Sequence, residues 1–118
     1  MSFAFLSHSS SDKDIVEKLA ERLGQDNVFI DKWNLDYGKY LPSEIAKGVY
    51  ESKWFILIAS KAAMESHWVK YEINLAVIRS ILENDFNIIV AKIEECDIHP
   101  ELTPYLYVDY PNNASSAI

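Results

Sequence analysis

The chain has 118 residues, of which 49% are apolar and 25% are charged, and its formal net charge at pH 7 is -7. This length suits one globular domain. The negative charge excludes electrostatic, sequence-independent binding to nucleic acid or to an anionic membrane. The single cysteine, Cys96, cannot form an internal disulfide or share a zinc site with other cysteines, which indicates a reducing compartment.

The first half of the chain alternates short apolar runs with segments of helical spacing. Serines and an aspartate after the first run are good helix caps, and Gly24 ends the helix that follows them. A turn-rich loop surrounds Gly38, and Pro42 with Ser43 opens the next helix. The predicted elements are strands at residues 3–7 and 27–31 and helices at residues 14–24 and 42–53.

The second half continues the alternation. "WFILIAS" at residues 54–60 is a continuous apolar run, typical of a central strand that is covered on both faces. A long helix follows, with a break predicted near Ser66. The predicted elements are a helix at residues 62–84, strands at residues 86–93 and 105–110, and an irregular segment or single short turn at residues 96–104.

Strands that alternate with helices predict an α/β fold, with a parallel sheet, helices on both faces and right-handed crossovers. The common order for five such strands is 2-1-3-4-5. No helix follows the fifth strand, so we expect the last helix to be missing and residues 1–118 to be a single domain, the N-terminal part of a longer protein. Alternatively, another subunit covers that edge.

Ligands of open parallel sheets bind beyond the carboxyl ends of the strands, here between the first and third strands. The helix that carries Trp68 and Glu72 follows directly from the third strand, so its first half borders this crevice. For an arbitrary glutamate the common interpretation is a solvated residue, or one paired with Lys70 or Arg79. Trp68 alone would be assigned to the core.

Three segments, "FAFLSHSSSDKD", "VFIDKWNLDYGKYLPSEIAKGVYESKWFILIAS" and "WVKYEINLA", resemble in order and spacing the bacterial form of the TIR (Toll/interleukin-1 receptor) domain family. The resemblance covers residues 2 to about 110 and implies a flavodoxin-like fold. It also implies cleavage of nicotinamide from NAD+ by a glutamate in a WxxxE-like setting, which Glu72 in "WVKYE" matches. NAD+ is then the substrate, and neither a cofactor nor a metal is expected.

The resemblance further suggests which residues surround NAD+. Aromatic residues near Gly38 in the loop after the second strand (the BB loop) would face its rings, while serines of the first loop would receive a phosphate or ribose. A serine run before a helix is more often only a cap. The expected binding residues are Ser7, His8, Ser9, Trp33, Gly38, Tyr40 and Trp68.

There are departures from the family pattern. The "RDxxPG" form of the BB loop found in animal receptors is absent, and the distal "FW" motif is not visible. The first departure weakens an interpretation as a receptor-type adaptor.

By resemblance we expect an assembly-dependent NAD+ glycohydrolase that gives a linear or a cyclic ADP-ribose product. TIR domains would assemble with one another in the cytoplasm, gathered by an attached sensor domain in anti-phage immunity, with no direct nucleic acid or membrane partner. The alternative is a non-catalytic TIR–TIR interaction module. A phosphoacceptor receiver would need an aspartate at the end of the third strand, and a dinucleotide-binding Rossmann domain would need GxGxxG; both are absent.

Overall fold

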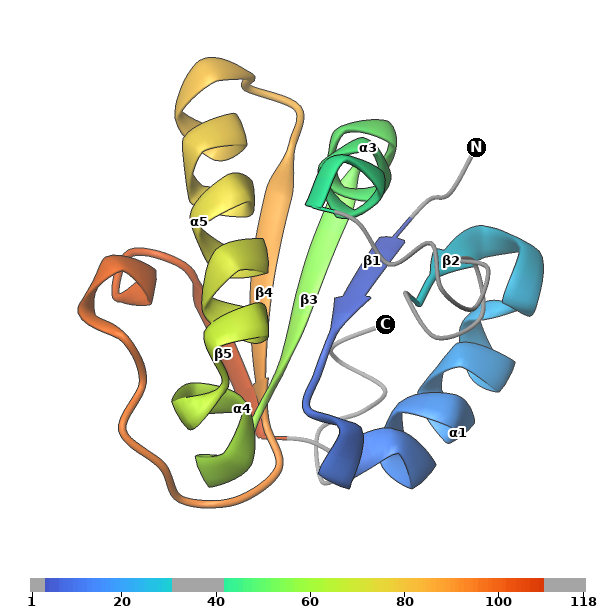
Figure 1. Ribbon diagram of the computed structural model, residues 1–118, viewed down its shortest axis with the longest axis vertical. Helices are drawn as coiled ribbons and strands as arrows, with labels where there is room; N and C mark the ends of the chain where they lie inside the picture. Colours follow the sequence, from blue (N-terminus) through green and yellow to red (C-terminus); the bar gives the residue numbers. More distant parts are fainter. Residues whose placement is uncertain (1–3, 31–41, 110–118) are drawn as a thin grey trace.

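The computed structural model describes residues 4–30 and 42–109, which form a parallel sheet with helices on both faces (Figure 1). The strands lie in the order β2-β1-β3-β4-β5, and the four neighbouring pairs are parallel. The predicted α/β class and strand order are therefore confirmed. The strands are β1 (Ala4–Ser7), β2 (Val28–Phe29), β3 (Trp54–Ala59), β4 (Asn87–Lys92) and β5 (Leu106–Asp109).

The helices begin and end where local chemistry predicts. Gly24 has a φ of 93° and donates its N–H to the carbonyl of Ala20, which ends the first helix. Ser66 caps the helix after it and confirms the predicted break. The described helices are α1 (Lys13–Leu23), α3 (Pro42–Glu51), α4 (Lys61–Glu65) and α5 (His67–Leu82), with 3-10 turns η1 (Ser10–Asp12), η2 (Gln25–Asn27) and η3 (Pro100–Leu102). In the part of the chain described, none of them is long and apolar enough to cross a bilayer.

Alternate residues of the strands face two separate cores. Helix α1 covers one face of the sheet, and α3, α4 and α5 cover the other (Figure 1). Phe5 and Phe55 point to the face of α3 and α5, where Phe5 stacks on Phe29 with ring centroids 5.1 Å apart. The face of α1 buries Ala4, Leu6, Val16, Leu19, Ala20, Val28, Ile30, Ile56, Ile58 and Ala91. Because successive side chains of a strand point to opposite faces, this alternation also decides which face the last residue of each strand points to.

The boundaries differ from the predicted ones mainly at the second strand. Strand β2 contains only Val28 and Phe29, whereas residues 27–31 were predicted to be extended. Asn27 belongs to η2 because its backbone N–H donates to the carbonyl of Gly24 at 2.9 Å, and its side-chain amide also donates to the carbonyl of Leu23 at 2.8 Å. Asp31 lies outside the described residues.

Candidate active site

The candidate site lies where β1 and β3 end side by side. The two strands pair in parallel from Ala4 with Trp54 to Ser7 with Leu57. Since β1 also pairs with β2 on its other side, the strand order reverses here, as it does at ligand sites of open α/β sheets. Ser7 is the last residue of β1, and Ser60 directly follows β3.

Glu72 lies in the first half of α5 and is only 1% exposed. The hydroxyl of Ser7, which is also 1% exposed, donates a hydrogen bond to Oε1 of Glu72 at 2.6 Å. The carboxyl group therefore faces the end of β1, at the position where the sequence predicts ligand binding. A solvated helix residue, the common interpretation of an arbitrary glutamate, is excluded by this burial.

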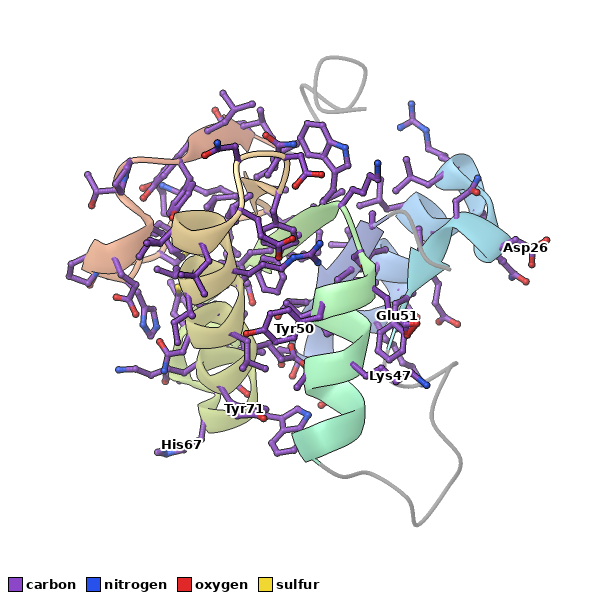
Figure 2. All side chains as sticks on the ribbon, turned by 90° about the horizontal axis from the view of Figure 1, so that it is seen from above. Asp26, Lys47, Tyr50, Glu51, His67 and Tyr71 are labelled. Atoms are coloured by element: carbon purple, nitrogen blue, oxygen red, sulfur yellow. The ribbon has the colours of Figure 1, made fainter. Side chains whose placement is uncertain are left out.

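Trp68 lies one helical turn before Glu72, half-buried against the core that α5 covers. Its ring centroid is 5.7 Å from that of Tyr71, with the planes tilted by 30°. Figure 2 shows Tyr71 directed from α5 toward α3, whereas His67 points away from the protein. Trp68 thus combines the core role with a position beside Glu72.

The first loop has the cap geometry that its serines predicted. Ser9 caps η1 by accepting the N–H of Ser11 at 3.2 Å. His8 is half-buried, with Nδ1 at 3.4 Å from the carbonyl oxygen of Leu6. The binding of a phosphate or ribose by Ser7, His8 and Ser9 stays a prediction.

A second serine–carboxylate pair, not expected from the sequence, joins the end of β3 to η1 on the face of the sheet that α1 covers, opposite the face of the Ser7–Glu72 pair. Ser60, 1% exposed, donates to Oδ2 of Asp12 at 2.5 Å and accepts the N–H of Ala63 at 3.0 Å. Its position immediately after β3, matching that of Ser7 at the end of β1, is the signal that could have found it.

Of the predicted site residues, the structure brings together Ser7 and Glu72, with Trp68 on the same helix and His8 and Ser9 in the adjoining loop. Trp33, Gly38 and Tyr40 lie outside the described residues. Within residues 4–30 and 42–109 there is no group of three or more histidine, cysteine or acidic side chains able to hold a metal ion.

A separate hollow of about 340 Å³ lies beyond the end of β4 and is lined by Lys61, Glu95, Cys96 and Asp97. Burial raises the pKa of the Cys96 thiol above 9.0, and Glu94, Glu95 and Asp97 raise it further, against the lowering effect of Lys92. The thiol is therefore protonated near neutral pH and is a poor nucleophile.

The Ser7–Glu72 pair gives the site its chemical capability. A carboxylate kept out of bulk water interacts more strongly with a positive charge than a solvated one does, because the local dielectric constant is low. Such a group can stabilise a cationic transition state or orient hydroxyl groups of a sugar.

Comparison with known proteins identifies a matching family and related proteins. The family described as "TIR domain" matches residues 4–117. The chain is 36% identical over 80 residues to "2' cyclic ADP-D-ribose synthase BtTIR" of Bacteroides thetaiotaomicron, covering 65% of this chain and 28% of the relative. It is 33% identical over 116 residues to "NAD(+) hydrolase TirS" of Staphylococcus aureus (strain MSSA476), covering 94% of this chain and 41% of the relative. The chain thus spans less than half the length of these relatives.

The fold also has a solved counterpart. The TIR domain of the Toll-related receptor TRR-2 from Hydra magnipapillata superposes with a TM-score of 0.72, covering 99% of this chain and 90% of the receptor domain. At 15% identity this likeness concerns the fold alone. With the family match over residues 4–117 and the sheet order 2-1-3-4-5 both established, the chain belongs to the TIR domain family.

Proposed function

We propose that this TIR domain cleaves NAD+ between nicotinamide and ribose, with Glu72 as the catalytic carboxylate. The observation that carries the proposal is the place of Glu72, buried in the "WVKYE" segment and bonded to Ser7 where β1 ends. The relatives named as a hydrolase of NAD+ and as a synthase of a cyclic ADP-ribose support the same substrate.

The reaction breaks the bond between C1′ of the ribose and the ring nitrogen of nicotinamide. The bonding electron pair leaves with nicotinamide and neutralises its ring, while positive charge develops on the ribose. The Glu72 carboxylate stabilises that charge. Addition of water at C1′ with loss of a proton gives ADP-ribose, and attack by a hydroxyl group of the substrate itself gives a cyclic product.

The burial of Glu72 supports a requirement for activation. A ribose cannot touch a side chain that is 1% exposed until the groups covering it move. We link this opening to assembly of TIR domains, in which the BB loop of one copy, with Trp33, Gly38 and Tyr40, completes the pocket of the next copy. In the whole protein a sensor domain would gather the TIR domains, as an effector of anti-phage immunity in the cytoplasm.

The test is nicotinamide release from NAD+ by the protein at low concentration and after clustering through an affinity tag on vesicles. Clustering is expected to switch release on, with ADP-ribose or its cyclic form produced in equal amount. Glu72→Gln keeps the shape and should reduce the clustered rate by about 100-fold or more, because the charge that meets the transition state is lost. Glu83→Gln makes the same change at the other end of α5 and should keep the rate.

The alternative is a TIR–TIR interaction module that makes no product. The burial of Glu72 and its internal bond to Ser7 favour it, because both also suit a purely structural residue. Self-association of the clustered parent without any nicotinamide release would establish this alternative and overturn the enzymatic proposal.

A further inference from the structure

Two serines at the ends of neighbouring strands each donate a hydrogen bond to a carboxylate on an element that follows the other strand. Ser7 ends β1 and donates to Glu72 on α5, a helix that follows β3. Ser60 follows β3 and donates to Asp12 in η1, which follows β1. Both serines are 1% exposed, so both bonds are shielded from water on the serine side.

The two bonds have different consequences. Ser60 also caps α4 through the N–H of Ala63, so its hydroxyl has an evident role in folding. Ser7, by contrast, donates to Oε1 of Glu72 at 2.6 Å, the length of a charge-assisted O–H···O bond. A hydroxyl has one proton to donate, so Ser7 cannot also donate to a phosphate or ribose of a ligand while this bond exists.

We infer that Ser7 is a positioning residue for Glu72: its hydroxyl holds the carboxylate in the orientation in which it acts on NAD+, without contacting the substrate. This inference rests on the proposed function. A glutamate side chain has three rotatable torsions, and a bond to one carboxylate oxygen from a strand end restricts the last of them. Strand β1 thus holds Glu72 from outside its own helix.

An orienting bond affects the transition state more than substrate binding. Misplacement of a catalytic group by about 1 Å can lower a rate by about 100-fold. Removal of the Ser7 hydroxyl should therefore lower kcat by about 10- to 100-fold, with KM changed by less than about twofold. Direct contact between Ser7 and the substrate would instead raise KM.

The experiment measures kcat and KM for nicotinamide release by the clustered protein carrying Ser7→Ala, Ser7→Thr or Ser60→Ala, with thermal unfolding of each variant. Ser7→Ala should lose kcat, and Ser7→Thr, which keeps a hydroxyl, should recover most of it. Ser60→Ala is the matched control, because it removes the other buried serine–carboxylate bond and should lower Tm with little change in kcat. If Ser7→Ala does not fold, Ser7→Cys keeps the size with a weaker donor and should show a smaller loss of kcat.

Three results would overturn the inference while the proposed function stands: an unchanged kcat in folded Ser7→Ala, equal losses of kcat in Ser7→Ala and Ser60→Ala, or a raised KM at the parent kcat. No nicotinamide release by the clustered parent would overturn the proposed function itself, and the inference with it. The parent rate thus separates the two failures.

Discussion

Arg79 is a buried cation on α5 whose partners come mostly from α3 and its end. It is 7% exposed, and its Nη1 donates to the carbonyls of Val49 and Ser52. Its Nε bonds to Glu83 at 2.7 Å, and the guanidinium lies 4.4 Å from the ring centroid of Phe86. The positive charge thus meets the negative end of the α3 dipole.

We predict that Arg79→Ala lowers the free energy of unfolding by about 3 kcal/mol, because two buried carbonyls lose their donor and the packing on Phe86 is lost. Urea unfolding measures this change. The control Glu83→Gln removes the charge of a partner that is 44% exposed and should cost less than about 1 kcal/mol. An equal loss of unfolding free energy in the two variants would contradict a stabilising role for the hydrogen bonds from Arg79 to the two carbonyls.

Cys96 offers a prediction with a defined pH dependence. Its pKa in the folded chain is raised above 9.0 by burial and acidic neighbours. The folded state therefore keeps its proton to higher pH than the unfolded state, so this contribution to stability is present below pH 9.0 and is lost as pH rises through the folded pKa. Alkylation rates followed against pH should have a midpoint above 9.0 in the folded protein, and a midpoint at or below 9.0 would contradict the assigned surroundings.

At the scale of the elements, α3 lies close against β2 because residue 48 is glycine. A Cβ atom at Gly48 would lie 2.8 Å from the ring atoms Cε1 and Cζ of Phe29, and that ring is stacked on Phe5. Figure 2 shows the opposite sides of the same helix, with Tyr50 toward α5 and Lys47 and Glu51 away from it. The missing side chain allows α3 to approach the sheet.

Gly48→Ala is therefore expected to destabilise the fold by about 1–3 kcal/mol, although alanine is favoured over glycine inside a helix by about 1 kcal/mol. The steric term should exceed the propensity term, because the ring that must move is held by its neighbours. Phe29→Leu in the Gly48→Ala background should recover part of the loss in a double-mutant cycle. The control Lys47→Ala, an exposed change in the same helix, should keep the free energy of unfolding within about 0.5 kcal/mol of the parent. Stabilisation by Gly48→Ala would contradict the close approach of α3 to β2.

The elements show what local patterns in the sequence can and cannot predict. The helix end at Gly24 and the break at Ser66 follow from capping, which acts over a few residues. The strand order was predicted from the alternation of strands and helices together with the common order of such sheets. The bond between Ser7 and Glu72 joins residues 65 positions apart, and the clamp of Arg79 on α3 joins residues about 30 apart. Spacing placed Ser7 and Glu72 at one crevice, but the partner of each side chain depends on the packed structure.

At the scale of the whole molecule, the charge of -7 opposes association of copies. Raising the ionic strength from about 0.01 M to about 0.15 M shortens the Debye length from about 30 Å to about 8 Å and should weaken this repulsion. If assembly activates the proposed cleavage of NAD+, the protein concentration for half-maximal nicotinamide release by the untethered chain should fall with added salt. Vesicle-clustered protein, already assembled, should respond little. Inhibition of the untethered chain by salt would indicate that ion pairs between copies hold the assembly.

The proposed role of the Glu72 charge in cleavage of NAD+ can be measured as the initial rate of nicotinamide release per clustered molecule for the parent and for Glu72→Gln, at matched surface density and with matched Tm. The parent rate should be higher by about 100-fold or more. Equal rates from the two folded proteins would contradict the proposed role of Glu72.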